Sequence, residues 1–112
     1  IITQMFFDNE AFFRFRDEAT KLGITVPIIP GIKPLYKREH LEVLPRIFHT
    51  KIPDAVRNSM ERYSEPDDIY KAGIAASIAQ CKDLLAHGVP GLHFYSMSVA
   101  KPTSDVLNGL KI

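Results

Sequence analysis

The stretch Val26-Pro27-Ile28-Ile29-Pro30-Gly31-Ile32 decides the fold class, because a short apolar run is followed there by a turn signal. Residues Val26–Ile29 are continuously apolar, which is typical of a parallel strand covered on both faces. Pro27 lacks an amide hydrogen, so we expect it at the first paired position of the strand. Pro30 and Gly31 predict a turn directly after the strand.

Two further apolar runs, Ile1–Phe7 and Gly91–Tyr95, predict strands of the same kind. Helical patterns separate the three strands. The predicted helices run from Asp8 or Asn9 to Leu22, over Arg38–Leu44 with Pro45 as a limit or kink, from Pro53, from Pro66 to His87-Gly88, and from Thr103 or Ser104. Their expected inner faces are Phe12, Phe15, Ala19 and Leu22; Val56, Met60 and Tyr63; Ile74, Ile78, Cys81 and Leu85; and Val106, Leu107 and Leu110.

This alternation predicts an α/β fold with parallel strands and right-handed crossovers. Three parallel strands leave both edges of a sheet open, and such edges invite pairing with further strands. The chain also opens with Ile1 inside an apolar run. We therefore expect a section of a larger sheet or closed barrel, cut from a longer protein.

Composition excludes several classes of function. The 112 residues carry a formal net charge of +1, which favours neither nucleic acid nor a membrane surface as a partner. Cys81 is the one cysteine and falls on an apolar helical face, so we interpret it as a core residue of a protein from a reducing, cytoplasmic environment. The histidines are scattered without metal-ligand spacing, and no glycine-rich phosphate-binding motif is present.

Three segments could carry chemistry, because ligands of parallel α/β folds bind beyond the carboxyl ends of the strands. Gln4 is an amide within an apolar strand, and it either makes a structural bond or recognises a ligand with a mixed donor and acceptor edge. Pro30-Gly31 is more typical of a structural turn. His93 and Tyr95 should share one side of their strand, where each could belong to the core or contact a ligand.

The order and spacing of several segments resemble the methylenetetrahydrofolate reductase family. The resemblance covers essentially the whole chain. It rests on Ile2-Thr3-Gln4-Met5-Phe6-Phe7-Asp8-Asn9, Val26-Pro27-Ile28-Ile29-Pro30-Gly31-Ile32 and Gly88-Val89-Pro90-Gly91-Leu92-His93-Phe94-Tyr95, with support from Ile52-Pro53 and Gly73-Ile74.

The resemblance implies the last three βα units of a (β/α)8 TIM barrel that binds FAD. NADH or NADPH would reduce the flavin, which would then reduce 5,10-methylenetetrahydrofolate to 5-methyltetrahydrofolate. Gln4 matches the family glutamine that contacts both the pterin and the reduced nicotinamide cofactor. Leu44 matches an apolar position near the folate, and Met97 falls in a loop that borders the ligand.

Two positions depart from the family pattern. His40 stands where many members have a glutamine that contacts folate, and it can still donate one hydrogen bond. Val99 stands where the family commonly has an arginine that helps to hold the substrate. Lys101 is the nearest positive charge and is our candidate replacement, although a lysine does not reproduce a bidentate arginine contact.

The resemblance places the general acid, the acidic residue that tunes the flavin and most FAD contacts on earlier strands, so we assign no catalytic residue and no metal ligand here. We expect the 112-residue chain alone neither to bind FAD firmly nor to turn over, and we expect it to form a homo-oligomer that covers its open edges. The alternatives are a non-catalytic α/β interaction module built on a half barrel and, more weakly, a relative of proline dehydrogenase.

Overall fold

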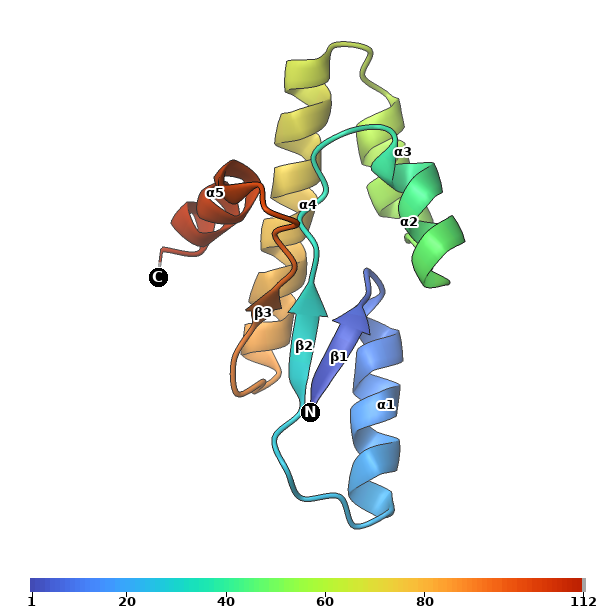
Figure 1. The fold of residues 1–112 in the computed structure, drawn as a ribbon, viewed down its shortest axis with the longest axis vertical. Coiled ribbons are helices and arrows are strands. Elements are labelled where there is room, and N and C mark those ends of the chain that lie inside the picture. Colours follow the sequence, from blue (N-terminus) through green and yellow to red (C-terminus); the bar gives the residue numbers. More distant parts are fainter. Residues whose placement is uncertain (112) are drawn as a thin grey trace.

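Three parallel strands lie at the centre of the computed structural model, which describes residues 1–111 (Figure 1). Strands β1 (Ile2–Met5), β2 (Ile29–Ile32) and β3 (His93–Phe94) form a sheet in the order β1-β2-β3. Five helices follow or separate them: α1 (Asn9–Lys21), α2 (His40–Phe48), α3 (Asp54–Glu61), α4 (Pro66–Ala86) and α5 (Ala100–Leu110). The predicted α/β class with parallel strands alternating with helices is confirmed.

Helix α1 begins and ends where the sequence predicts. The side chain of Asp8 accepts from the amide of Glu10 at 3.1 Å, and Gly23 leaves the helix at a φ of 84°. The predicted inner face is only partly correct, however. Phe12 and Ala19 are buried, whereas Phe15 and Leu22 are 49% and 79% exposed. The apolar stripe of α1 is therefore wider than the surface that the described chain offers to cover it.

Helix α2 passes through Pro45 and ends at Phe48, so its predicted end at Leu44 is wrong. Pro45 cannot donate to the carbonyl of Leu41, four residues earlier. A guanidinium nitrogen of Arg57, on α3, donates to that carbonyl at 2.8 Å. The helix tolerates its internal proline because a side chain from a neighbouring helix takes the vacant hydrogen bond.

The long helix α4 buries Ile74 and Cys81 as predicted, but Leu84 takes the place predicted for Leu85, which is 40% exposed. Helix α5 begins at Ala100, earlier than the predicted start at Thr103 or Ser104. Pro102 lies in its first turn, where a helix does not need the amide hydrogen.

Strand β2 is displaced from its predicted position. The sequence predicted a strand over Val26–Ile29 and a turn at Pro30-Gly31, whereas Pro30 and Gly31 lie within the observed strand Ile29–Ile32. Central strands exclude proline except beside an irregularity of the ladder. Such an irregularity lies directly opposite, in β1. Strands β1 and β3 are shorter than the predicted Ile1–Phe7 and Gly91–Tyr95.

The core lies in two clusters of buried side chains. One joins α1, β2, α4 and α5 and includes Phe12, Ile32, Cys81 and Val106. The other joins the end of β1 to the helices α2, α3 and α4 near the carboxyl ends of the strands (Figure 1). Together they fix one face of the sheet and leave residues of the other face, such as Ile2 and Gln4, exposed.

Candidate functional site

The carboxyl ends of the three strands lie at the same end of the sheet, as parallel pairing requires (Figure 1). Gln4 lies near the end of β1, the segment Lys33–Glu39 follows β2, and Tyr95 follows β3. Ligands of parallel α/β folds bind at the carboxyl ends of the strands. The structure also brings together Gln4, Gly31 and Tyr95, one residue from each segment that the sequence singled out.

A bulge in β1 distorts the sheet near the carboxyl ends of the strands. Ile2 pairs with Ile29 and Met5 pairs with Gly31, so β1 contains one residue more than β2 between the two pairs. The amide of Ile29 donates to the carbonyl of Ile1 at 2.7 Å. A regular parallel ladder would continue with the amide of Gly31 donating to the carbonyl of Thr3. Instead, that amide donates to the side-chain hydroxyl of Thr3 at 2.9 Å.

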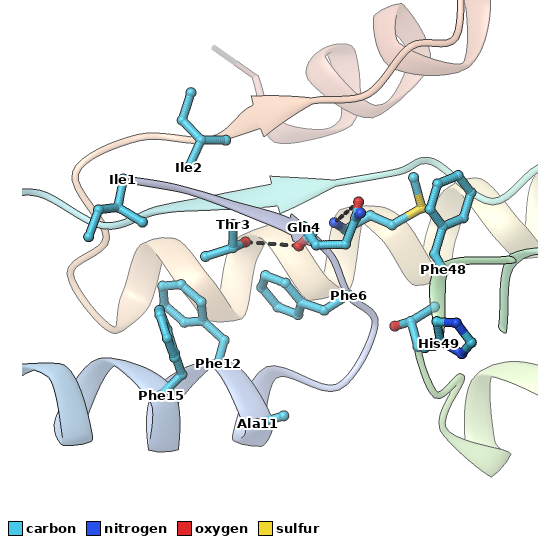
Figure 2. A pocket seen from close by; sticks show the side chains of 12 residues that line it. Ile1, Ile2, Thr3, Gln4, Phe6, Ala11, Phe12, Phe15, Phe48 and His49 are labelled. Carbon is cyan, nitrogen blue, oxygen red and sulfur yellow. Dashed lines mark hydrogen bonds between the residues drawn. The ribbon is translucent and has the colours of Figure 1, made fainter.

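Side chains take over the hydrogen bonds that the bulge disrupts. The hydroxyl of Thr3 donates to the carbonyl of Gln4 at 2.9 Å, and the amide of Met5 donates to Oε1 of Gln4 at 2.9 Å (Figure 2). The hydroxyl of Tyr95 donates to the carbonyl of Thr3 at 2.8 Å. Because bulges re-aim side chains, this network sets the direction of Gln4.

Tyr95 reaches β1 by passing over β2 at Gly31. A Cβ atom at Gly31 would lie 2.5 Å from the carbonyl oxygen of Thr3 and 2.6 Å from Cε2 of Tyr95. Only glycine leaves space for both groups. The ring of His93 lies against that of Tyr95 with centroids 4.8 Å apart, which confirms that these two residues share one side of their strand.

Gln4 is exposed, although its strand is apolar in sequence. Its Oε1 is engaged by the amide of Met5, so its NH2 group is the part directed to other partners. An exposed amide near the carboxyl end of a strand is better placed to contact a ligand than to serve only as a structural hydrogen-bonding group.

His40 is buried and lies at the start of α2. Burial, followed by the charges of Lys33 and Lys37, lowers the pKa of His40 to about 4, so the ring is neutral at pH 7. The amide of Tyr36 donates to its Nδ1 at 3.2 Å. The proton of the neutral ring therefore lies on Nε2, which makes His40 a hydrogen-bond donor toward any further partner.

Lys33 is a feature that sequence reasoning missed. It follows β2 directly and is only 3% exposed. Its ammonium group donates to the carbonyl of Pro34 at 3.0 Å and lies 4.6 Å from the centroid of the Tyr36 ring. Burial, followed by the charge of Lys37, lowers the pKa of Lys33 to about 8. A lysine inside an otherwise apolar run, as in Gly31-Ile32-Lys33-Pro34-Leu35, was the available signal.

Leu44 and Met97 occupy different environments. Leu44 is buried in the second core cluster with Met5 and Leu41. Met97 is 49% exposed in the loop after β3, where Met97 and Ser98 have positive φ angles of 53° and 65°. Non-glycine residues rarely adopt this conformation, and they cluster at functional sites.

Lys101 is directed to a different part of the molecule. Its ammonium group donates to Asp105 at 2.8 Å and lies 4.6 Å from the ring centroid of Tyr70, on α4. The hydroxyl of Tyr70 donates to the same carboxylate at 2.5 Å. These contacts hold Lys101 between α4 and α5, away from Gln4. Val99, at the position of the family arginine, is 42% exposed.

An apolar groove of about 460 Å³ runs along the outer edge of β1 (Figure 2). It lies between β1, α1 and the end of α2, and Ile2, Phe12, Phe15 and Phe48 line it with Gln4. No strand among residues 1–111 pairs with this edge of β1. The groove is large enough for several apolar side chains.

Metal-ligand clusters and membrane-spanning helices are both absent from residues 1–111. Over residues 1–111, no group of three or more histidine, cysteine, aspartate or glutamate residues could hold a metal ion. Within the same range, none of the helices has the length and apolar character that crossing a bilayer requires.

Comparison with known proteins places this arrangement in a family. The family profile described as Methylenetetrahydrofolate reductase matches residues 1–111. The chain belongs to the methylenetetrahydrofolate reductase family. It is 34% identical to Methylenetetrahydrofolate reductase (NADH) 1 of Arabidopsis thaliana, over 98% of this chain and 19% of that protein. It is 36% identical to 5,10-methylenetetrahydrofolate reductase of Buchnera aphidicola, over 95% of this chain and 35% of that protein.

Other family members and solved structures extend the comparison. The chain is 33% identical to a probable methylenetetrahydrofolate reductase (NADPH) of Caenorhabditis elegans, over 98% of this chain and 17% of that protein. It thus spans about a fifth to a third of these relatives. A Clostridium thermocellum protein described as binding two copies of 5-methyl-5,6,7,8-tetrahydrofolic acid has a similar fold. Its TM-score is 0.62 at 18% identity, over 98% of this chain and 41% of that one.

The described strand ends do not fit the diphosphate of FAD, the cofactor that the family resemblance implies. Helix α4 carries Asp67 and Asp68 in its first turn, which repel an anion there. Lys101, in the first turn of α5, is already paired with Asp105. Of the cations that follow β2, Lys33 is buried and Lys37 lies 5.8 Å from the centroid of the Tyr36 ring. The exposed amide of Gln4 suits a neutral heterocyclic edge.

Proposed function

We propose that this chain supplies part of the folate- and nicotinamide-binding edge of a complete methylenetetrahydrofolate reductase. The parent enzyme would reduce 5,10-methylenetetrahydrofolate to 5-methyltetrahydrofolate with NADH or NADPH through FAD. The observation that carries this proposal is the exposed amide of Gln4, held by a bulge at the carboxyl end of β1 in a chain of this family. An amide both donates and accepts, which suits the edge of a pterin and that of a nicotinamide carboxamide.

Other residues complete the proposed edge. His40 is 5% exposed and would act from beneath the site with its Nε2 hydrogen, and Met97 would border the ligand from the exposed loop after β3. Leu44 would act from the core beneath the site, since it is buried. Folate binding by a protein of similar fold supports this ligand class.

The open edge of β1 supports a larger barrel around the described strands. Its apolar groove is lined by Ile2, Phe15 and Phe48, and a further βα unit would cover such a surface. The bacterial relative is almost three times as long as the matched region, which leaves ample length for further strands. We infer that these strands close a TIM barrel and bind FAD, and that the isolated chain is inactive. On its own, it should self-associate through this edge, which sedimentation would detect.

The test has two parts. The purified 112-residue chain should contain no flavin and oxidise no NADH, with or without added FAD. In the complete reductase, Gln4→Glu removes the amide donor and should raise KM for both folate and NADH about tenfold or more. The matched control is Asn108→Asp, an exposed amide on α5, which should change neither constant.

Each result discriminates between readings of the chain. Turnover by the isolated chain would place the reaction centre on the described strands and contradict the proposal. An unchanged KM for both ligands in Gln4→Glu would remove Gln4 from the ligand edge. A complete protein that folds without flavin or folate binding would favour the non-catalytic α/β interaction module.

A further inference from the structure

Gln4 lies in a strand segment that the ladder does not hold in the usual way. Regular pairing between β1 and β2 is interrupted at Thr3 and Gln4, which lie between the paired residues Ile2 and Met5. No strand of residues 1–111 pairs with the other edge of β1. Side-chain hydrogen bonds therefore contribute to the direction of Gln4 where the ladder is irregular.

Two hydroxyl groups supply these bonds. The hydroxyl of Thr3 accepts from the amide of Gly31 at 2.9 Å and donates to the carbonyl of Gln4 at 2.9 Å. The hydroxyl of Tyr95 donates to the carbonyl of Thr3 at 2.8 Å. The Thr3 hydroxyl thus links the peptide after Gln4 to β2, and the Tyr95 hydroxyl links the peptide before Gln4 to the residue that follows β3.

The ring of Tyr95 reaches Thr3 through space that the absence of a side chain at Gly31 leaves open. Its ring lies so close over Gly31 that a Cβ atom there would be 2.6 Å from Cε2. The ring of His93 supports Tyr95 from the side, with centroids 4.8 Å apart. A ring held on two sides places its hydroxyl with little loss of entropy on bonding.

From this geometry we infer that Thr3 and Tyr95 are positioning residues that act through Gln4: their hydroxyls lock the β1 bulge so that the amide of Gln4 faces the ligand. The inference rests on the proposed role of Gln4. Bulges of this kind recur next to active sites, where they re-aim a side chain. Loss of either hydroxyl frees the bulge and lets Gln4 adopt several directions.

The experiment uses the complete reductase with bound flavin. Tyr95→Phe keeps the ring and removes the hydroxyl, and Thr3→Val keeps the shape and removes the other hydroxyl. Each should weaken the binding of folate and NADH about five- to tenfold, as expected for one lost hydrogen bond. The flavin absorption spectrum should stay unchanged. Thr3→Ser retains the hydroxyl and should restore the affinity.

A double-mutant cycle separates action through Gln4 from direct contact. In a Gln4→Leu background, Tyr95→Phe and Thr3→Val should cause no further loss of affinity, because the group that they position is gone. A full additional loss in that background would overturn the inference and assign these hydroxyls direct or purely structural roles. Unchanged affinity in both single variants would overturn it as well.

Failure of the proposed function gives a different result. If Gln4→Leu alone leaves both affinities unchanged, Gln4 does not contact the ligands and the proposed function of this edge fails. In that case the nitrogen resonance of the Gln4 side-chain amide still reports on the bulge. It should broaden or shift in Tyr95→Phe if the hydroxyl holds Gln4, and it should stay in place if the inference is wrong.

Discussion

The helix-covered side of the sheet and the carboxyl ends of its strands are built on different principles. The first packs apolar side chains such as Phe12, Ile32, Leu84 and Val106, which follow regular helical and strand periods. The second contains a bulge, a buried lysine and two non-glycine residues with positive φ. The first region is organised for stability, and the second departs from local rules where the proposed ligand binds.

The largest effects should come from two glycines at close contacts near the carboxyl ends of the strands. Gly73 of α4 packs against the backbone of Leu35, and Gly31 lies beneath Tyr95. Alanine at either position should destabilise the chain by about 3 kcal/mol, because backbone atoms would have to move. Urea unfolding measures both, and Gly109→Ala should cost less, since only the side chain of Ile78 opposes it. Equal effects at all three positions would contradict this ranking.

Lys33 should cost stability in the second region. Its pKa of about 8 shows that the charged ammonium is less stable in the folded chain than in the unfolded chain. Lys33→Met removes this buried charge and should therefore stabilise the chain by about 1–3 kcal/mol. The folded pKa lies below the ordinary value of 10.5, so wild-type stability should rise between pH 8 and 10.5. Thermal unfolding across this range provides the measurement. Destabilisation by Lys33→Met would show that its contacts with Pro34 and Tyr36 outweigh the burial of charge.

His40 should make the same region sensitive to acid. Its folded pKa of about 4 lies below the ordinary 6.5, so the unfolded chain binds the proton more readily. The free energy of unfolding should therefore be highest above about pH 6.5. It should decrease as pH falls toward 4, by an amount on the order of 2 kcal/mol. His40→Gln should flatten the stability profile in this window. A profile that keeps its slope would assign the acid sensitivity to other groups.

The smallest effect should be that of Lys101 on the ligand. Because its ammonium group is shared by Asp105 and Tyr70, Lys101→Ala in the complete enzyme should change folate affinity by less than twofold. Isothermal titration with 5-methyltetrahydrofolate measures it. A tenfold loss would restore Lys101 as the replacement for the family arginine.

The sequence predicted the helix-covered region better than the strand ends. Regular periods predicted α1, α4 and the alternation of strands and helices along the chain, because apolar spacing directly reflects which face is buried. The course of β2 through Pro30 was missed, since it depends on a bulge in another strand. The length of α2 was missed because Arg57 compensates for Pro45 from outside the helix. The ligand contacts of Gln4 and His40 stay predictions, and the burial of Lys33 was missed because it depends on tertiary packing around it.

The hydrogen bond between Tyr95 and Thr3 also sets an order of events during synthesis. The two residues are 92 positions apart, so the bulge in the first strand stays unlocked until nearly the whole segment has left the ribosome. Until then Thr3 and Gln4 lack one of the two hydroxyl contacts that hold the bulge. Slow translation within the segment would prolong the time during which the bulge lacks this bond.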